Sequence, residues 1–282
     1  MSRFIKGMDI ERVSGAQISV VTEALKKLKD YGINYIRLSI WSDDSLAQEN
    51  DIEAAGRFKL EEAVKIAKAA NEANIRVMLN FYYCREKAGK WADMDLAGLE
   101  QGIYDFTYDS MMAFKEEDIR ISMAQIGCGL SKGIFRPEGE AGEYANLTSF
   151  ASSGIRACRS ADPGVPLMLH LSDGCDNKMC REWFDNYIDS GEDFEYIGLS
   201  YECDEENTPR KLEHNLNDIA LRFSKELVVL PAMGVKEEDA EDLLDRIKRV
   251  VGYSGAGIFF KQRSLFDSHG NPTEITNTLK AF

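Results

Sequence analysis

The sequence predicts an α/β fold, a single (β/α)8 TIM barrel formed by one domain over residues 1–282. Short apolar runs, typical of parallel strands buried on both faces, alternate with amphipathic helical segments along the whole chain. The length of 282 residues is close to the roughly 250 residues of one such barrel. No Gly-rich dinucleotide loop follows any strand, which disfavours the alternative of a doubly wound open sheet.

The predicted strands are eight short segments rich in Ile, Leu, Val and aromatic residues. In chain order they are FIKGMDI (4–10), NYIRLSI (34–40), IRVMLNFYY (75–83), ISMAQIG (121–127), PLMLHLS (166–172), FEYIGLSY (194–201), ELVVLPA (226–232) and GAGIFFK (255–261). Segments with apolar residues at helical spacing follow them, and these are expected to form the outer ring. They are 19–32, 58–73, 102–118, 147–160, 179–191, 212–225, 237–252 and 273–282.

The charge and the apolar pattern exclude several classes of partner. The formal net charge is −14, from 48 acidic and 34 basic residues, so nucleic acid and anionic membranes are not expected to bind. No run of 18 apolar residues is present to span a bilayer. The N-terminal MSRFIKGMDI lacks a signal-peptide core, which predicts a cytoplasmic chain as it stands, or a secreted one if a signal has been removed. Six cysteines do not indicate a disulfide scaffold.

The candidate site follows from the fold, because a barrel of this type carries its function at the C-terminal ends of its strands. Reading those ends gives a predicted ligand-binding mouth without an assigned metal or cofactor. Its residues are Asp9, Ser39, Trp41, Asn80, Tyr82, Tyr83, Cys128, His170, Asp173, Tyr201, Glu202 and Lys261.

The same strand ends resemble, in order and spacing, glycoside hydrolase family 53, the endo-β-1,4-galactanases that cut the galactan side chains of pectin. The resemblance runs through nearly the whole chain. It rests on FIKGMDI, NYIRLSIW, VMLNFYYC, MAQIGCGLSKGIFRPEG, IGLSYECDEENT, NLNDIALRFSKELVVLPAM, GIFFKQ and LFDSHGNP. The resemblance implies a retaining mechanism, which uses an acid/base and a nucleophile about 5–5.5 Å apart.

The departures from the family pattern fall on that chemistry. The acid/base is the Glu of an Asn-Glu pair that ends the fourth strand, and this chain has Cys128-Gly129 there. The nucleophile is the Glu that ends the seventh strand, and this chain has Pro231. Neither residue can transfer a proton or attack an anomeric carbon, so endo-galactanase activity is expected to be lost.

Supporting positions have changed as well. The family's Arg, Asp and His near the site correspond to Ser39, Asn80 and Tyr82, and its Trp-Glu at the eighth strand corresponds to Lys261-Gln262. The leading hypothesis is therefore a pseudoenzyme that binds a galactan-type oligosaccharide or a partner protein at the old mouth. The aromatic residues of the mouth would stack on sugar faces or would simply fill the top layer of the barrel.

Two alternatives remain open at this point. New strand-end acids, among them Asp173, Glu202, Glu205 and Glu206, would support a repurposed hydrolase, although charge runs are usually solvated loops. A thiolate metal site would use cysteines predicted on the top face together with His170 or Asp173. Those cysteines are Cys84, Cys128, Cys175, Cys180 and Cys203. A third reading is a mouth plugged by its own side chains.

Overall fold

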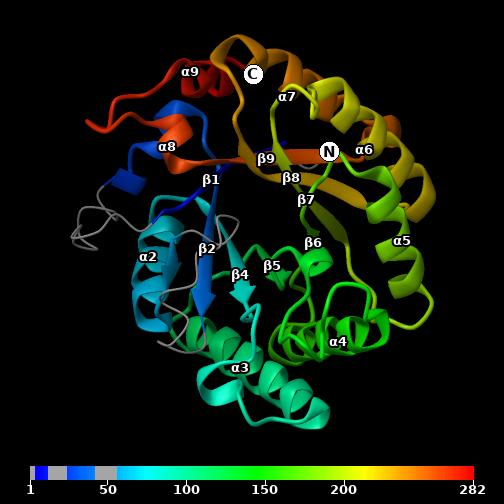
Figure 1. Ribbon diagram of the computed structural model, residues 1–282. Helices are drawn as coiled ribbons and strands as arrows, with labels where there is room; N and C mark the ends of the chain where they lie inside the picture. The colour runs from blue at the N-terminus through cyan, green and yellow to red at the C-terminus, as the bar shows by residue number, and fades with distance from the viewer. Residues whose placement is uncertain (1–3, 12–23, 42–55) are drawn as a thin grey trace.

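The computed structural model describes residues 4–11, 24–41 and 56–282, and these confirm the (β/α)8 barrel (Figure 1). Eight parallel strands in the described residues close on themselves, because β1 pairs with both β2 and β9. All eight predicted strands are present. They are β1 (Ile5–Asp9), β2 (Tyr35–Trp41), β4 (Arg76–Tyr82), β5 (Met123–Ile126), β6 (Leu167–Leu171), β7 (Tyr196–Glu202), β8 (Glu226–Met233) and β9 (Gly255–Lys261).

A ninth strand, β3 (Arg57–Phe58), was not predicted. It pairs with Ser39 and Ile40 of β2, beyond the point where β1 ends. The sequence pattern placed these residues near the start of a helix over 58–73, whereas the helix begins at Leu60.

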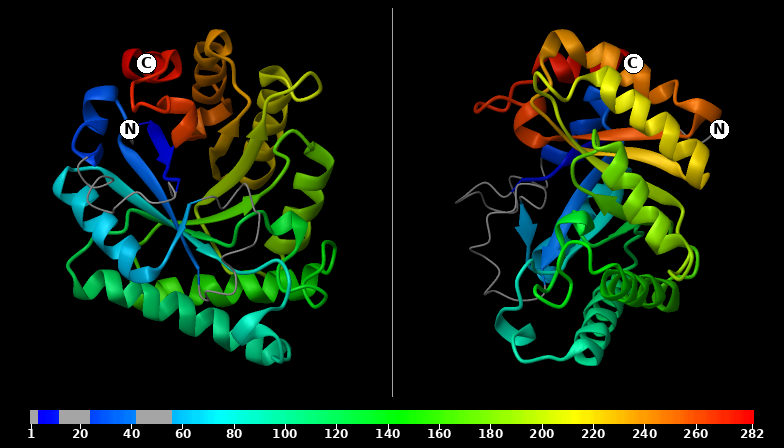
Figure 2. Two further views of the ribbon diagram at one scale, coloured as in Figure 1. Left: turned by 60° about the vertical axis from the view of Figure 1, so that its left-hand side comes forward. Right: turned by 45° about the vertical axis from the view of Figure 1, so that its right-hand side comes forward.

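The helices form a ring outside the strands (Figures 1 and 2). They are α2 (Leu60–Glu72), α3 (Leu96–Glu116), α4 (Tyr144–Ala161), α5 (Asn177–Ile188), α6 (Pro209–Phe223), α7 (Ala240–Lys248), α8 (Gln262–Leu265) and α9 (Glu274–Ala281). Short 3-10 helices are η1 (Leu28–Tyr31), η4 (Gly89–Trp91), η5 (Leu130–Lys132), η6 (Glu237–Asp239) and η7 (Val251–Tyr253). Residues 19–23 of the predicted first helix lie outside the described part.

Side-chain caps explain where several helices begin. The Asp95 carboxylate accepts a hydrogen bond from the Gly98 N–H at 2.8 Å, which pairs one of the free donors at the start of α3. The Thr208 hydroxyl accepts from the Lys211 N–H at the start of α6, where Pro209 occupies the first turn. No helix in the described residues has both the length and the apolar character needed to cross a membrane.

The interior of the barrel changes character along its axis. Alternate strand residues point inward, and those toward the N-terminal ends form an apolar cluster. The cluster is Ile5, Tyr35, Met78, Met123, Met168, Val228, Leu230 and Phe259. At Gly7 a Cβ would stand 2.2 Å from the Phe259 ring, so glycine is needed for the strands to close here. The next inward positions on the same strands are polar and buried: Asp9, Arg37, Ser39, Asn80, Gln125, His170 and Lys261.

The N-terminal end of the barrel is closed by a satisfied polar network. The Asn34 amide donates to the Phe4 carbonyl at 2.8 Å and accepts from the Lys6 N–H at 3.0 Å. The Lys6 ammonium donates to the carbonyl of Leu279 in α9, and the Phe4 ring contacts the Phe282 ring with centroids 5.3 Å apart. These contacts hold β1 against the last helix and so close the barrel at its bottom.

Candidate functional site

A buried ion cluster lies at the top of the barrel. Oδ2 of Asp9 accepts from Nη1 of Arg37 at 3.1 Å and from Nζ of Lys261 at 2.6 Å, and all three side chains are at most 1% exposed. They come from neighbouring strands in direct register, since Asp9 faces Arg37 on β2 and Lys261 on β9. Burial opposes the charge of Arg37, but the nearby Asp9 carboxylate offsets it, and the pKa of Arg37 lies above its ordinary value. One oxygen of Asp9 is therefore shared between two cationic side chains.

Arg37 links this cluster to the end of β5. Its Nε donates to Oε1 of Gln125 at 3.0 Å, and its Nη2 contacts Sγ of Cys128 at 3.4 Å. The Gln125 amide in turn donates to the Gly127 carbonyl at 2.8 Å. The planar guanidinium thus positions Cys128. Gln125 was not among the predicted site residues. It lies two residues after Met123 on β5, so its side chain is on the inward face of the strand.

Three buried polar atoms at the mouth have no hydrogen-bond partner among the described residues. Asn80 donates from its Nδ2 to Oγ of Ser39 at 2.8 Å, which leaves its Oδ1 unpaired. Oδ1 of Asp9 and Nε1 of Trp41 are unpaired as well. A buried polar atom without a partner costs about 1–3 kcal/mol. Such atoms mark the place where a ligand or water completes the structure.

His170 connects the end of β5 to β8. Its Nδ1 accepts from the Gly129 N–H at 2.7 Å, so Nε2 carries the proton and donates to the Leu230 carbonyl at 2.8 Å. The Ser200 hydroxyl lies 3.0 Å from the same Nε2. Pro231 follows Leu230 directly. The ring therefore ties the end of β5 to β8 as a neutral, structural group.

The four predicted aromatic residues divide into two pairs. Trp41 and Tyr82 are buried beside the guanidinium of Arg57, which lies 5.6 and 4.5 Å from their ring centroids. Tyr83 and Tyr201 do not line the mouth, because alternation along their strands turns both outward into the core shared with the helices. The Tyr83 hydroxyl bonds Thr107 of α3 at 2.8 Å, and the Tyr201 hydroxyl donates to the Asn207 carbonyl at 3.0 Å.

The predicted acids do not gather in the barrel. Asp173 and Glu202 are exposed, and Asp9 is the one buried carboxylate among the described residues. Asp204 accepts hydrogen bonds from the backbone N–H groups of Asn207 and Glu206, and these lower the pKa of its carboxyl group. The acidic segment after β7 therefore forms a solvated loop held by its own turn.

The cysteines do not form a metal centre in the part of the chain that the structure describes. All six are free thiols, and no group of three His, Cys, Asp or Glu side chains among residues 4–11, 24–41 and 56–282 is arranged to hold an ion. Burial raises the pKa of Cys175 to about 11 and that of Cys180 to about 12, so both are neutral thiols at pH 7. Cys128 packs against the Tyr82 ring.

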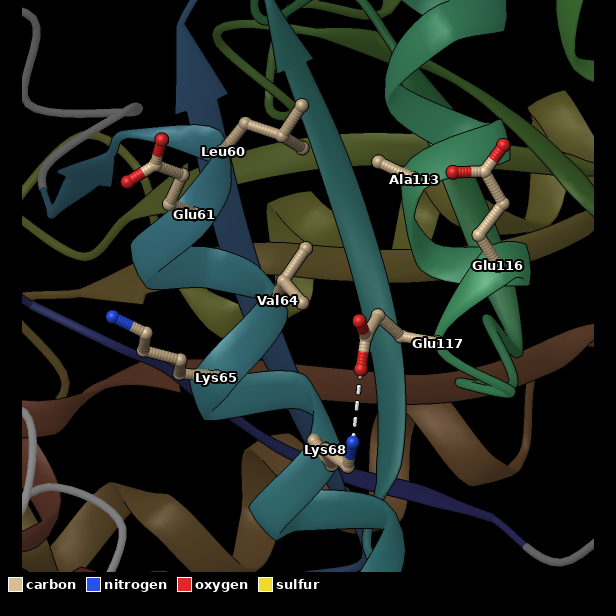
Figure 3. Close-up of a pocket in the computed structure, with 8 residues that line it drawn as sticks. All are labelled: Leu60, Glu61, Val64, Lys65, Lys68, Ala113, Glu116 and Glu117. Atoms are coloured by element: carbon tan, nitrogen blue, oxygen red, sulfur yellow. Dashed lines mark hydrogen bonds and ion pairs between the residues drawn. The ribbon is translucent and has the colours of Figure 1, made fainter.

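A separate hollow of about 520 Å³ lies outside the barrel, between α2 and α3 (Figure 3). Leu60, Val64 and Ala113 form its apolar part. Lys68 and Glu117 form an ion pair of 2.9 Å at one end. None of the strand-end residues contributes to it, so it is a groove between helices rather than part of the barrel mouth.

Comparisons with known proteins agree with the fold and with the strand-end motifs. The family model described as glycosyl hydrolase family 53 matches residues 6–266. An arabinogalactan endo-β-1,4-galactanase of Humicola insolens is 24% identical over 254 residues, which cover 80% of this chain and 72% of that protein. An uncharacterized protein of Niallia circulans, from the bgaB 5′ region, is 26% identical over 91% of this chain and 82% of its own length.

Solved structures show the same fold. The GH53 catalytic domain of Ignisphaera aggregans superimposes with a TM-score of 0.82 at 19% identity, covering 98% of this chain and 94% of that one. A fungal β-1,4-galactanase gives the same TM-score at 17% identity, covering 99% of this chain and 100% of the other.

Proposed function

The chain belongs to glycosyl hydrolase family 53, and from this premise we propose that it binds a carbohydrate at the barrel mouth without cleaving it. The supporting observation is the arrangement around His170. The imidazole hydrogen-bonds the backbone of Gly129 and of Leu230, at the two places where the family resemblance expects catalytic carboxylates. The fold is kept while the chemistry of these positions has been replaced by a structural link.

The remaining carboxylate is unsuited to glycoside cleavage. A retaining glycosidase needs one carboxylic acid that donates a proton and one carboxylate that attacks. Oδ2 of Asp9 is engaged in ion pairs with two cationic side chains, which is not the placement of a carboxylic acid that donates a proton to a leaving group. No second buried carboxylate faces it among the described residues.

Binding of a sugar is supported by the unpaired polar atoms of the mouth. Oδ1 of Asp9 and Oδ1 of Asn80 accept hydrogen bonds, and Nε1 of Trp41 donates one. A sugar hydroxyl is both a donor and an acceptor, so it can form a hydrogen bond with either the unpaired oxygens or the unpaired nitrogen. The named relatives are galactanases, which makes a galactan-type oligosaccharide the first ligand to test.

The test is a calorimetric titration of the whole chain with β-1,4-galactotetraose, followed by chromatography of the cell contents. We expect heat of binding and intact tetraose. A galactanase of the same family, run in parallel, shows that the conditions allow cleavage.

Shorter products in the cell would contradict the proposal and would return attention to the repurposed hydrolase. Absence of binding would also contradict it, and would favour a partner protein at this face. Neither the exposed acids nor the cysteines of the described part supply a feature that favours the hydrolase beforehand.

A further inference from the structure

We propose that Asp9 and Asn80 determine which sugar binds, by accepting hydrogen bonds from hydroxyl groups of a neutral ligand, and that the site discriminates against sugars that carry a carboxylate. This inference rests on the proposed function. It adds a mode of recognition, a chemical class of ligand and two specificity-determining residues.

The two acceptors belong to one polar layer. Asp9 ends β1 and Asn80 lies on β4, with β2 between them. Asp9 is level with Arg37, while Asn80 is level with Ser39, the next inward residue of β2. Since neighbouring strands lie about 4.8 Å apart and inward side chains converge in a barrel, two groups of one ligand can reach both acceptors.

Charge identifies the donor that fits. Arg37 and Lys261 both contact Oδ2 of Asp9, which leaves Oδ1 as the acceptor without a partner among the described residues. A ligand ammonium would be repelled by these two cations. A ligand carboxylate has no hydrogen to give to either oxygen and would stand beside the negative charge of Asp9. A neutral hydroxyl satisfies both acceptors without either penalty.

Ring stacking is not the main mode of recognition at this mouth. The guanidinium of Arg57 already lies over the Tyr82 and Trp41 rings, and Tyr83 and Tyr201 face the helices. The resemblance places a tryptophan of related enzymes at Lys261, whose ammonium now bonds Asp9. Recognition through hydrogen bonds depends on the configuration of individual hydroxyls, whereas stacking tolerates many sugars.

Asn80→Leu tests the residue assignment, because it removes the unpaired oxygen and keeps a similar volume, although it also removes the hydrogen bond from Nδ2 to Ser39. Titration with β-1,4-galactotetraose is expected to give a Kd about tenfold higher than that of the native chain, the loss of one buried hydrogen bond. Asn34→Leu is the matched control, since Asn34 is also a buried asparagine, directly before β2, but both its amide atoms are paired at the bottom of the barrel. Its Kd should stay within about twofold of the native value.

Asn80→Asp is the conservative variant, because it keeps an oxygen acceptor at the same place. It should retain binding where Asn80→Leu loses it, which separates loss of the acceptor from loss of the fold. Circular dichroism of each variant checks that the barrel is intact. Equal Kd values for the native chain and a folded Asn80→Leu variant would overturn the residue assignment.

A second titration tests the class of ligand. A galacturonate tetramer is expected to bind at least about tenfold more weakly than galactotetraose, because its carboxylates meet Asp9. Tighter binding of the uronate would mean that Arg37 and Lys261 dominate, and would overturn the inference while leaving carbohydrate binding in place. Binding of neither sugar would overturn the proposed function, and this inference with it.

Discussion

The two ends of the barrel interior treat buried polar groups in opposite ways. At the bottom, Asn34 has a partner for each atom of its amide and sits beside an apolar cluster. At the top, Asn80 and Asp9 are buried equally well, yet each keeps an oxygen without a partner among the described residues. Stability of the fold alone favours the arrangement at the bottom, in which every buried polar atom named has a hydrogen-bond partner. The difference supports our proposal that the top of the barrel binds a ligand, whereas the bottom serves stability.

The largest expected effect comes from breaking the ion cluster with Arg37→Leu. This leaves Gln125 without its donor and removes one of the two cations from Asp9. Breaking a buried charge pair costs about 3–5 kcal/mol of the free energy of unfolding. Urea denaturation measures it, with the exposed Lys68→Met as a variant that should be unchanged. A small loss for Arg37→Leu would mean that the top layer adds little to stability.

The next effect is expected for His170→Phe, which keeps a ring but removes both nitrogens. The Gly129 N–H and the Leu230 carbonyl then lose their partners. Because each unsatisfied buried group costs about 1–3 kcal/mol, the free energy of unfolding should fall by about 2–4 kcal/mol. The same denaturation curves report it. A neutral result would contradict the role of His170 as a link between β5 and β8.

The comparison itself is sharpened by measuring Asn34→Leu and Asn80→Leu side by side. Asn34→Leu strands the Phe4 carbonyl and the Lys6 N–H, so we expect a loss of about 1–3 kcal/mol. Asn80→Leu removes one unpaired oxygen and one hydrogen bond, the donation from Nδ2 to Oγ of Ser39, so its loss should be about 1 kcal/mol. Thermal unfolding of both variants measures the two losses of stability, and the loss for Asn34→Leu should be the larger. Equal losses would remove the contrast between the two ends.

The smallest effect on activity is expected when Gly129→Glu is combined with Pro231→Glu to introduce the carboxylates that the family resemblance expects. Gly129 has φ of 60° and ψ of 53°, a left-handed conformation that costs a residue with a side chain about 1–2 kcal/mol. The restored carboxylates also lack their former surroundings, so we expect no cleavage of galactotetraose by chromatography. Gly129→Ala separates the backbone cost from the effect of charge. Product formation by the double variant would show that the mouth is still prepared for catalysis.

The strands and most helices of the fold could be predicted, because each depends on the pattern of apolar residues within a short segment. Apolar runs and helical spacing placed all eight barrel strands, and the resemblance placed the residues at their ends. The two-residue strand β3 escaped because so short a segment has no periodicity of its own. Side chains alternate along a strand, so Tyr83 could have been predicted to point outward, opposite to Asn80 and Tyr82. The alternation is hard to recognise in the sequence because nearly every residue of this segment is apolar.

Which side chains of the site contact one another could not be predicted from local patterns. Lys261 meets Asp9 across 252 residues, and only closure of the barrel brings them together. His170 was predicted to belong to the ligand-binding mouth, but its two partners, Gly129 and Leu230, contribute backbone groups, which the identity of a residue does not reveal. Gln125 could have been found from its position two residues after Met123 on the inward face.

The hydrogen bond between Gly129 and His170 has an evolutionary consequence. A single substitution toward a glutamate at this position meets an unfavourable backbone conformation and a neighbour that already uses the local N–H. Substitutions among residues that share a hydrogen-bond network do not have additive effects. A glutamate at this position is therefore expected to be tolerated only together with changes at its neighbours. Under the function that we propose, a lineage with this arrangement can change which ligand it binds more easily than it can acquire a glutamate at this position.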